Sequence, residues 1–142
     1  MNVLVDTSVW SLALRRRSSQ LSTAESTAVS ELAELIREER VRLIGIVRQE
    51  VLSGIKETAQ FERLRSTLRA YEDETLSTDD FEAAAKASND CRARGLLSSA
   101  VDILICSTAI RRKWLIFTTD PDFRRYANVI SIRLHRPRAF RS

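Results

Sequence analysis

Four carboxylates stand at the ends or beginnings of predicted elements: Asp6, Glu50, Asp102 and Asp120. Carboxylates held within a few ångströms of one another repel, and some must stay protonated unless a cation neutralises them. Four oxygen donors with no nearby His or Cys suit a hard ion such as Mg²⁺ or Mn²⁺. Such an ion can activate water and stabilise charge on a phosphoryl oxygen. These residue types therefore predict a divalent-metal site, provided that the fold brings them together.

Each acid also has a purely structural interpretation. Asp6 and Asp120 could each be a helix N-cap, and Ser99 with Asp102 has the spacing of a capping box. Glu50 could be a solvated residue on the outside of its helix. These interpretations do not require that all four acids lie on the same side of a sheet, whereas a metal site does.

Apolar strands alternate with amphipathic helices along the chain. Predicted strands cover residues 2–5, 42–46, 114–118 and 129–132, with a further short one at 74–77. Predicted helices cover residues 8–14, 23–39, 47–55, 59–71, 78–94, 100–112 and 122–126. The strands are continuously apolar, which is typical of a parallel sheet covered on both faces. We predict an α/β fold, a three-layer α/β/α sandwich around a mostly parallel sheet of four to five strands.

The carboxyl ends of parallel strands share one edge of the sheet, where open α/β folds bind their ligands. Asp6 follows the first predicted strand and Asp120 follows the strand at 114–118. Glu50 lies in the first turn or so of the helix after the second strand, and Asp102 in the first turn of its own helix. The topology thus predicts that all four acids lie at this edge.

Length and composition are those of one globular domain. The chain has 142 residues, of which 44% are hydrophobic and 30% charged, so we expect a single domain over 1–142 with a basic, irregular tail from about residue 134. Asp6 interrupts the N-terminal apolar run, and no apolar stretch is long enough for a bilayer, so we expect no signal peptide and no membrane association. Cys91 and Cys106 match no zinc or disulfide pattern and are expected to be buried thiols of a cytoplasmic protein.

The net charge is +4, and the basic residues are clustered. The clusters are 15–17, 111–113, 124–125 and a tail containing Arg133, Arg136, Arg138 and Arg141. Each cluster could be a solvated helix face. Together they could bind a polyanion: a basic surface around an acidic pocket is what a metal-dependent nuclease needs. The single histidine, His135, excludes a two-histidine ribonuclease mechanism, and no Gly-rich phosphate loop is present.

Four segments resemble, in order and spacing, the motifs of PIN-domain proteins, and most closely the VapC toxins of bacterial toxin–antitoxin pairs. The segments are LVDTSVW, VRQEVLSG, RARGLLSSAVDILICSTAI and FTTDPDF. The resemblance spans the chain from Val3 to about Ile132. It implies a PIN-like fold and an endoribonuclease, dependent on Mg²⁺ with Mn²⁺ as a substitute, that hydrolyses RNA with metal-activated water as the toxin of a type II pair.

The resemblance also implies roles for individual residues. The catalytic and metal-binding acids of the family fall on Asp6, Glu50, Asp102 and Asp120. Ser8 resembles a hydroxyl position that supports the metal site. Asp122 is a second acid in the last motif, expected in a supporting or surface position because its neighbour Phe123 points into the core. Whether Asp120 or Asp122 is the fourth acid stays open.

Partners are implied in the same way. The resemblance suggests a homodimer, a small cognate antitoxin, and a structured RNA substrate such as transfer RNA or ribosomal RNA. The antitoxin is expected to lay a helix in an apolar groove built from the helices at 23–39 and 59–71. Trp10 belongs either to that groove or to the core.

Two other functions are compatible with the same residues. The chain could be a non-catalytic RNA-binding or partner-binding module on the same fold, although loss of one or more acids would then be expected. A DNA nuclease of the same chemistry is the third possibility, but the short chain lacks obvious insertions for threading a DNA flap.

Overall fold

A three-stranded parallel sheet forms the centre of the computed structural model, which describes residues 1–138. The strands are β1 (Val3–Val5), β2 (Val41–Arg42) and β3 (Leu115–Phe117), in the order β2-β1-β3. Val3 pairs with Val41 on one side and with Leu115 on the other. All three residues of β1 are fully buried, as expected for a central parallel strand covered on both faces.

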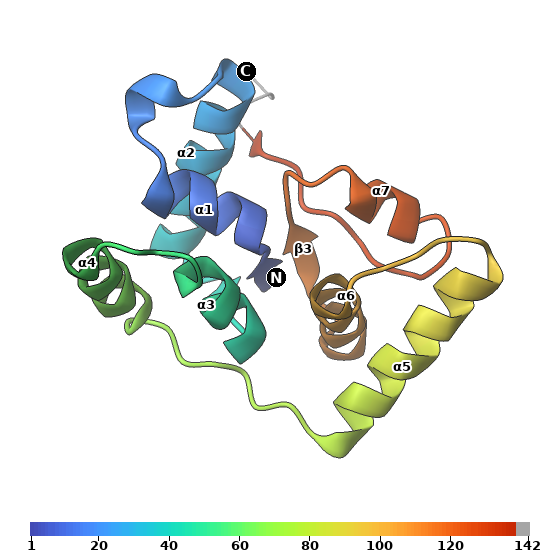
Figure 1. The fold of residues 1–142 in the computed structure, drawn as a ribbon. Helices are drawn as coiled ribbons and strands as arrows, with labels where there is room; N and C mark the ends of the chain where they lie inside the picture. Colours follow the sequence, from blue (N-terminus) through green and yellow to red (C-terminus); the bar gives the residue numbers. More distant parts are fainter. Residues whose placement is uncertain (139–142) are drawn as a thin grey trace.

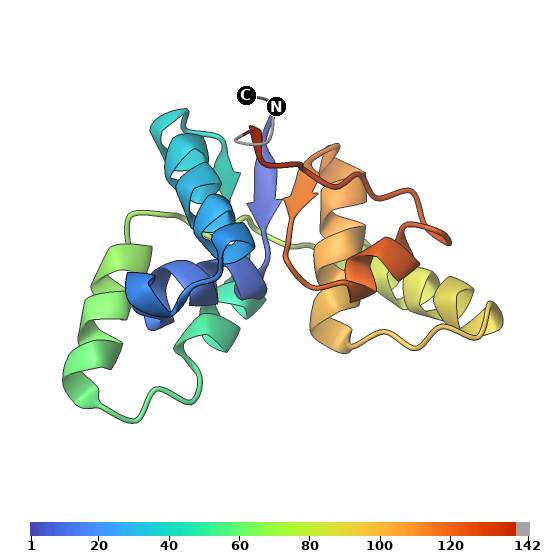
Figure 2. The ribbon, with the colours of Figure 1, turned by 90° about the horizontal axis from the view of Figure 1, so that it is seen from above.

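Seven α-helices and one short 3-10 helix surround the sheet in the described part of the chain. They are α1 (Thr7–Arg15), η1 (Ser18–Gln20), α2 (Thr23–Arg37), α3 (Gly45–Leu52), α4 (Thr58–Leu68), α5 (Thr78–Ala93), α6 (Ala100–Arg112) and α7 (Asp122–Tyr126). Helices α1 to α4 lie on one side of the sheet and α5 to α7 on the other (Figures 1 and 2). The predicted α/β class and three-layer arrangement are therefore confirmed.

Local sequence explains several helix boundaries. Ser22 and Glu25 form a capping box at the start of α2, with the Glu25 amide donating to Ser22 Oγ at 3.1 Å and the Ser22 amide donating to Glu25 Oε1 at 2.9 Å. Ser99 Oγ accepts the Asp102 amide at 3.0 Å and begins α6. Helix α6 ends at Lys113, whose φ of 60° places it in the left-handed region. The predicted bounds of α6 and α7 are those observed.

The sheet has fewer strands than predicted. Residues 74–77 and 129–132 are not strands; instead Leu43 and Asp73 form one isolated bridge, and Ile116 and Leu134 form another. The amides of residues 129 and 130 both donate to the Tyr126 carbonyl, at 2.9 Å each. These bonds continue the turn after α7, so the chain reaches β3 only at Leu134.

The second strand is also shorter than predicted. It covers Val41–Arg42 rather than residues 42–46, and α3 already begins at Gly45. Residues 43 and 44 remain fully buried, so the apolar run extends further than the strand pairing. The consequence for the site is that Glu50 lies in the second turn of α3.

Two of the predicted basic clusters are partly neutralised inside the molecule. Asp80, whose side chain is 1% exposed, pairs with Arg111 and Arg112 at 2.8 and 2.7 Å. In the tail, Arg138 pairs with Glu31 at 3.0 Å, and His135 Nε2 lies 2.9 Å from the same carboxylate. These contacts fasten α5 to α6 and the tail to α2, so those arginines serve the fold.

Cys91 and Cys106 are both buried and free, as predicted. No helix among residues 1–138 is both long and apolar enough to cross a bilayer.

Candidate metal centre

The carboxyl ends of β1 and β3 carry two of the predicted acids. Asp6 follows β1, and its amide donates to the Phe117 carbonyl at the end of β3 at 2.8 Å. Asp120 lies three residues after β3. The parallel pairing of these two strands therefore places both segments at one edge of the sheet, as the topology predicted.

Two hydroxyl groups hold the buried Asp6 side chain. Ser8 Oγ donates to Asp6 Oδ2 at 2.7 Å, and Thr118 Oγ1 donates to the same oxygen at 2.8 Å. Thr118 Oγ1 in turn accepts the Asp120 amide at 3.0 Å, and Ser8 Oγ accepts the Thr119 amide at 3.0 Å. The end of β1 is thus joined to the loop after β3 by side-chain hydrogen bonds, and Oδ1 of Asp6 has no side-chain donor within residues 1–138.

Asp102 is oriented by an aromatic residue that is remote in sequence. The Tyr126 hydroxyl, at the end of α7, donates to Asp102 Oδ2 at 2.9 Å. Ser99 caps α6 as its spacing predicted, but the Asp102 carboxylate is directed toward α7. The Asp102 carboxylate therefore does not form the second half of a capping box.

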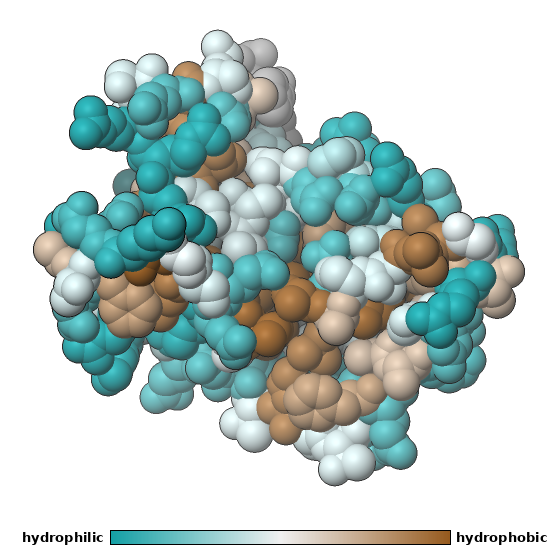
Figure 3. Space-filling view, viewed as in Figure 1, coloured by the Kyte–Doolittle hydropathy of each residue, from teal (hydrophilic) through white to brown (hydrophobic). Residues whose placement is uncertain are grey.

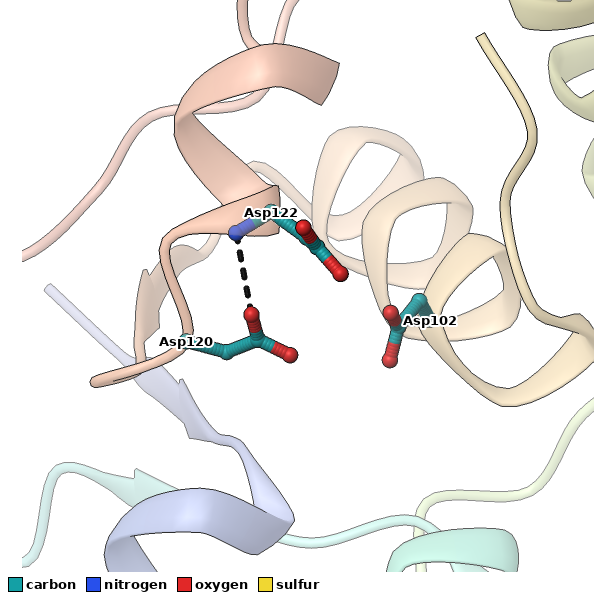
Figure 4. Close-up of side chains that lie close together, drawn as sticks. All are labelled: Asp102, Asp120 and Asp122. Carbon is teal, nitrogen blue, oxygen red and sulfur yellow. Dashed lines mark hydrogen bonds between the residues drawn. The ribbon is translucent and has the colours of Figure 1, made fainter.

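Three carboxylates converge in front of this edge. One oxygen each from Asp102, Asp120 and Asp122 lies within 4.8 Å of the others, and all three residues are partly buried. They come from α6, from the loop after β3 and from α7, and their side chains point toward a common space (Figure 4). The Asp122 amide donates to Asp120 Oδ1 at 2.9 Å, which fixes the start of α7.

Burial, and for Asp102 also neighbouring negative charge, disfavours the ionised form of two of these acids. Burial raises the pKa of Asp6, and the hydrogen bonds from Ser8 and Thr118 offset only part of that rise. Burial also raises the pKa of Asp102, the hydrogen bond from Tyr126 opposes it, and the negative charges of Asp6 and Asp120 raise it further. The negative charge of Asp6 therefore affects Asp102, although Asp6 is not one of the three acids whose oxygens lie within 4.8 Å of one another. A cation would relieve this repulsion.

Glu50 is not part of the close cluster. Its side chain is exposed on α3, and the group of oxygens within 4.8 Å of one another does not include it. Asp122 belongs to that group, although the sequence suggested a supporting or surface position for it. Its neighbour Phe123 is fully buried, as expected. Asp122 is also shared with Arg125, whose Nη1 lies 2.6 Å from Asp122 Oδ1.

Sequence reasoning missed two residues that the structure places at the site. Thr118 was assigned only as the end of a strand, although a hydroxyl directly after an apolar strand is a recognisable signal. Tyr126 carried no signal, because it lies 24 residues from its partner Asp102 and in another helix. Trp10, by contrast, is 1% exposed and packs edge-on to Tyr71, so it belongs to the core.

The donor set matches the needs of a hard divalent ion. Oxygen ligands from three carboxylates, with Asp6 close by, are typical of Mg²⁺ or Mn²⁺ sites. Burial raises the pKa of Asp6, and burial together with the charges of Asp6 and Asp120 raises the pKa of Asp102; a bound cation would favour the ionised form of both acids. The arrangement can therefore hold a divalent cation at the carboxyl edge of the sheet.

Comparison with known proteins gives the same picture of the fold. A model of the PIN-domain family, described as "PIN domain", matches residues 3–129. No curated protein sequence matches the chain significantly.

Solved structures resemble nearly the whole chain at low sequence identity. VapBC2 from Rickettsia felis, bound to a promoter DNA fragment, has a TM-score of 0.74 at 19% identity, over 95% of this chain and 98% of that one. FitAcB from Neisseria gonorrhoeae has a TM-score of 0.73 at 21% identity, over 95% and 97%. VapBC-5 from Mycobacterium tuberculosis, of the VapBC family of toxin–antitoxin systems, has a TM-score of 0.65 at 16% identity, over 96% and 99%.

Proposed function

This chain belongs to the PIN-domain family, and on that premise we propose that it is a metal-dependent endoribonuclease, the VapC-type toxin of a type II toxin–antitoxin pair. One observation carries the proposal. Asp102, Asp120 and Asp122 place an oxygen each within 4.8 Å of the others, beside the buried Asp6. Crowded acids of this kind are stable together only when a cation or protons neutralise them.

Mg²⁺ is the proposed cofactor, with Mn²⁺ as a substitute. Asp102 and Asp120 would hold the ion, with Asp6 and Asp122 the further candidates among the acids at the edge of the sheet. When bound, the ion supplies activation of water and stabilisation of charge on a phosphoryl oxygen. This chemistry requires no histidine, in agreement with the position of His135 beside Glu31.

The surrounding residues keep the acids in position. Ser8 and Thr118 orient Asp6 through one oxygen, and Tyr126 orients Asp102. Such hydrogen bonds fix the ligand geometry and tune ligand basicity at metal sites. Glu50, on α3, stays a predicted catalytic residue, and it is tested separately from the close cluster.

A protein partner is the second part of the proposal. VapBC-5 from Mycobacterium tuberculosis is described as a member of the VapBC family of toxin–antitoxin systems. By this similarity we propose a small cognate antitoxin for this chain, with α2 and α4 as the elements that contact it, and a cytoplasmic location for the pair.

A second copy of the chain is the proposed occupant of an apolar surface. Phe81 is 54% exposed and lies beside a cleft of about 380 Å³ that is also lined by Ile46, Ala84, Val101 and Leu104. Figure 3 shows apolar residues gathered over α3 and the start of α5. An exposed aromatic side chain beside an apolar cleft is suited to a two-fold interface, in which each copy inserts Phe81 into the cleft of the other. This surface supports the expected homodimer.

RNA cleavage tests the enzymatic part directly. Purified protein is incubated with total transfer RNA or ribosomes and with Mg²⁺ or Mn²⁺, and the new 5′ ends are mapped. Asp6→Asn, Asp102→Asn and Glu50→Gln should each lower the rate by about 100-fold or more, the scale of losing a charged group at the reacting centre. Asp79→Asn, an exposed acid of α5, is the matched control and should cleave like wild type.

The outcome separates the enzyme from its main alternative. Cleavage that continues unchanged in Asp6→Asn and Asp102→Asn would show that the acids are not the catalytic centre. RNA binding without metal-dependent turnover in the wild-type protein would instead identify a non-catalytic module on the same fold.

A further inference from the structure

A groove of mixed polar and apolar lining adjoins the acid cluster. It has a volume of about 820 Å³ and lies between residues 118–121, which carry Asp120, and residues 134–137 of the tail, with Arg124 of α7 on its wall. Asp120 is thus shared by the acid cluster and the groove. Any chain that occupies the groove passes directly beside the candidate metal centre.

The tail wall of this groove is fixed by hydrogen bonds. The His135 amide donates to the Ile116 carbonyl at 2.7 Å, and the Ile116 amide donates to the Arg133 carbonyl at 2.9 Å. The His135 ring contacts the buried Glu31 carboxylate, which also binds Arg138. The groove is therefore a preformed feature, although the tail itself is irregular in secondary structure.

Two cations on the groove have no ion-pair partner among the described residues. Arg124 and Arg136 are exposed, and neither forms an ion pair with another residue in the range 1–138. Their sequence neighbours differ: Arg125 pairs with Asp122 at 2.6 Å, and Arg138 pairs with Glu31 and Glu38. Within the described part of the chain, nothing competes with an external anion for these two arginines.

The groove and the acid cluster together have the charge pattern of a backbone-binding channel. The cluster repels a phosphate unless a cation is bound there, whereas free guanidinium groups bind phosphate oxygens directly. We propose that this groove binds the single-stranded backbone of the RNA substrate on one side of the scissile bond, with Arg124 and Arg136 contacting phosphates. This inference rests on the proposed ribonuclease function and adds the path of the substrate.

Binding to a cleavage-deficient protein tests the groove without turnover. In the Asp102→Asn background, the affinity for a fluorescein-labelled single-stranded RNA of about 12 nucleotides, within the range of single-strand sites, is measured by anisotropy at several NaCl concentrations. Arg124→Gln and Arg136→Gln should each weaken binding about 3- to 10-fold. The double variant should also reduce the slope of log K against log salt by about 0.7 for each lost phosphate contact.

Arg63→Gln is the matched control, because Arg63 is an exposed arginine of α4, on the other side of the sheet from α7. An equal loss of affinity in this control would overturn the proposal, since it would show general electrostatic attraction. RNA affinity that is unchanged in the double variant would also overturn it and would point to another occupant, such as an acidic protein segment. Circular dichroism melts verify that all variants are folded.

The same experiment separates this inference from the proposed enzyme. If wild-type protein cleaves RNA while the double variant binds as tightly as its parent, the groove assignment fails and the ribonuclease stands. If wild-type protein does not cleave but the double variant loses RNA affinity, the groove stands and the ribonuclease proposal fails.

Discussion

The Tyr126 hydroxyl donates a 2.9 Å hydrogen bond to Asp102 Oδ2 and so connects the end of α7 to the first turn of α6. Tyr126 is itself buried, and its ring packs edge-on against Phe123 at 5.3 Å between centroids. An acid of the candidate metal centre is therefore positioned by a core residue. The orientation of Asp102 at the edge of the sheet therefore depends on how Tyr126 packs against Phe123.

Replacing Tyr126 by Phe should make metal binding more sensitive to acid. Its hydrogen bond opposes the burial that raises the pKa of Asp102, so the pKa rises further once the donor is lost. A carboxylate must be deprotonated to bind a metal ion. We expect Mg²⁺ affinity to fall several-fold near pH 6 and to be little changed near pH 8, as measured by calorimetric titration. Tyr71→Phe, remote from the cluster, should leave both values unchanged; an identical pH profile for Tyr126→Phe would contradict the assignment.

Asp102→Asn should stabilise the metal-free protein. Two charges within 4.8 Å of each other repel by about 1 kcal/mol even at the dielectric constant of water, which corresponds to a rise in Tm of roughly 3–4 °C for a domain of this size. Differential scanning fluorimetry in EDTA measures the shift. If Asp102 were only a capping residue, the amide would be close to neutral.

The stabilising effect of Asp102→Asn should depend on pH. Because the pKa of Asp102 is raised in the folded state, ionising this residue costs folding free energy at neutral pH. That cost disappears as the pH falls through the raised pKa and the wild-type residue takes up a proton. The difference in Tm between variant and wild type should therefore be largest near neutral pH. It should fall toward zero as the pH approaches 3.8, the ordinary pKa of aspartate. A difference that does not vary with pH would exclude charge repulsion as its cause.

Mg²⁺ should stabilise the wild-type protein but not variants of the cluster. A ligand that binds only the native state at ten times its Kd adds about 1.4 kcal/mol, or about 4 °C in Tm. Asp102→Asn and Asp120→Asn should lose this shift, and Asp122→Asn decides whether the third carboxylate of the cluster is a ligand. NaCl at equal ionic strength is the control; a shift of equal size with NaCl would indicate screening alone.

Asp80→Asn should destabilise the fold without affecting the site. Arg112 donates to both oxygens of Asp80, at 2.7 and 2.9 Å, and breaking a buried pair from one side costs about 3 kcal/mol. Arg112 holds the pKa of Asp80 far below its ordinary value, so this contribution persists above pH 3.8 and is lost only as the pH falls through the lowered pKa. Urea denaturation at pH 5 and pH 8 should give the same loss. The rise in Tm on adding Mg²⁺ should be the same in this variant as in the wild type.

Phe81→Asp should separate the proposed dimer. Light scattering after gel filtration should give twice the chain mass of 16.2 kDa for the wild type and the single mass for the variant. Leu97→Asp alters an exposed apolar residue outside the cleft and should remain dimeric. A dimeric Phe81→Asp variant would place the interface elsewhere.

The amino-acid sequence by itself determined the layers of the fold and the order of its elements. Continuous apolar strands, helix caps such as Ser99 and the positions of the acids relative to strand ends are local signals, which depend on neighbouring residues only. That is why the bounds of α6 and α7, and the placement of Asp6 and Asp120 at one edge, could be predicted without coordinates.

Tertiary structure alone decided the number of paired strands and the membership of the cluster. Residues 129–132 are mostly apolar, yet the amides of residues 129 and 130 bond to the Tyr126 carbonyl, and the chain pairs with β3 only at Leu134. Asp122 joins Asp102, and Glu50 stays outside the close group, because the orientations of α3, α6 and α7 on the sheet set which oxygens meet. Packing between elements that are distant in the chain fixes these orientations. The hydrophobic periodicity within a single element does not encode them.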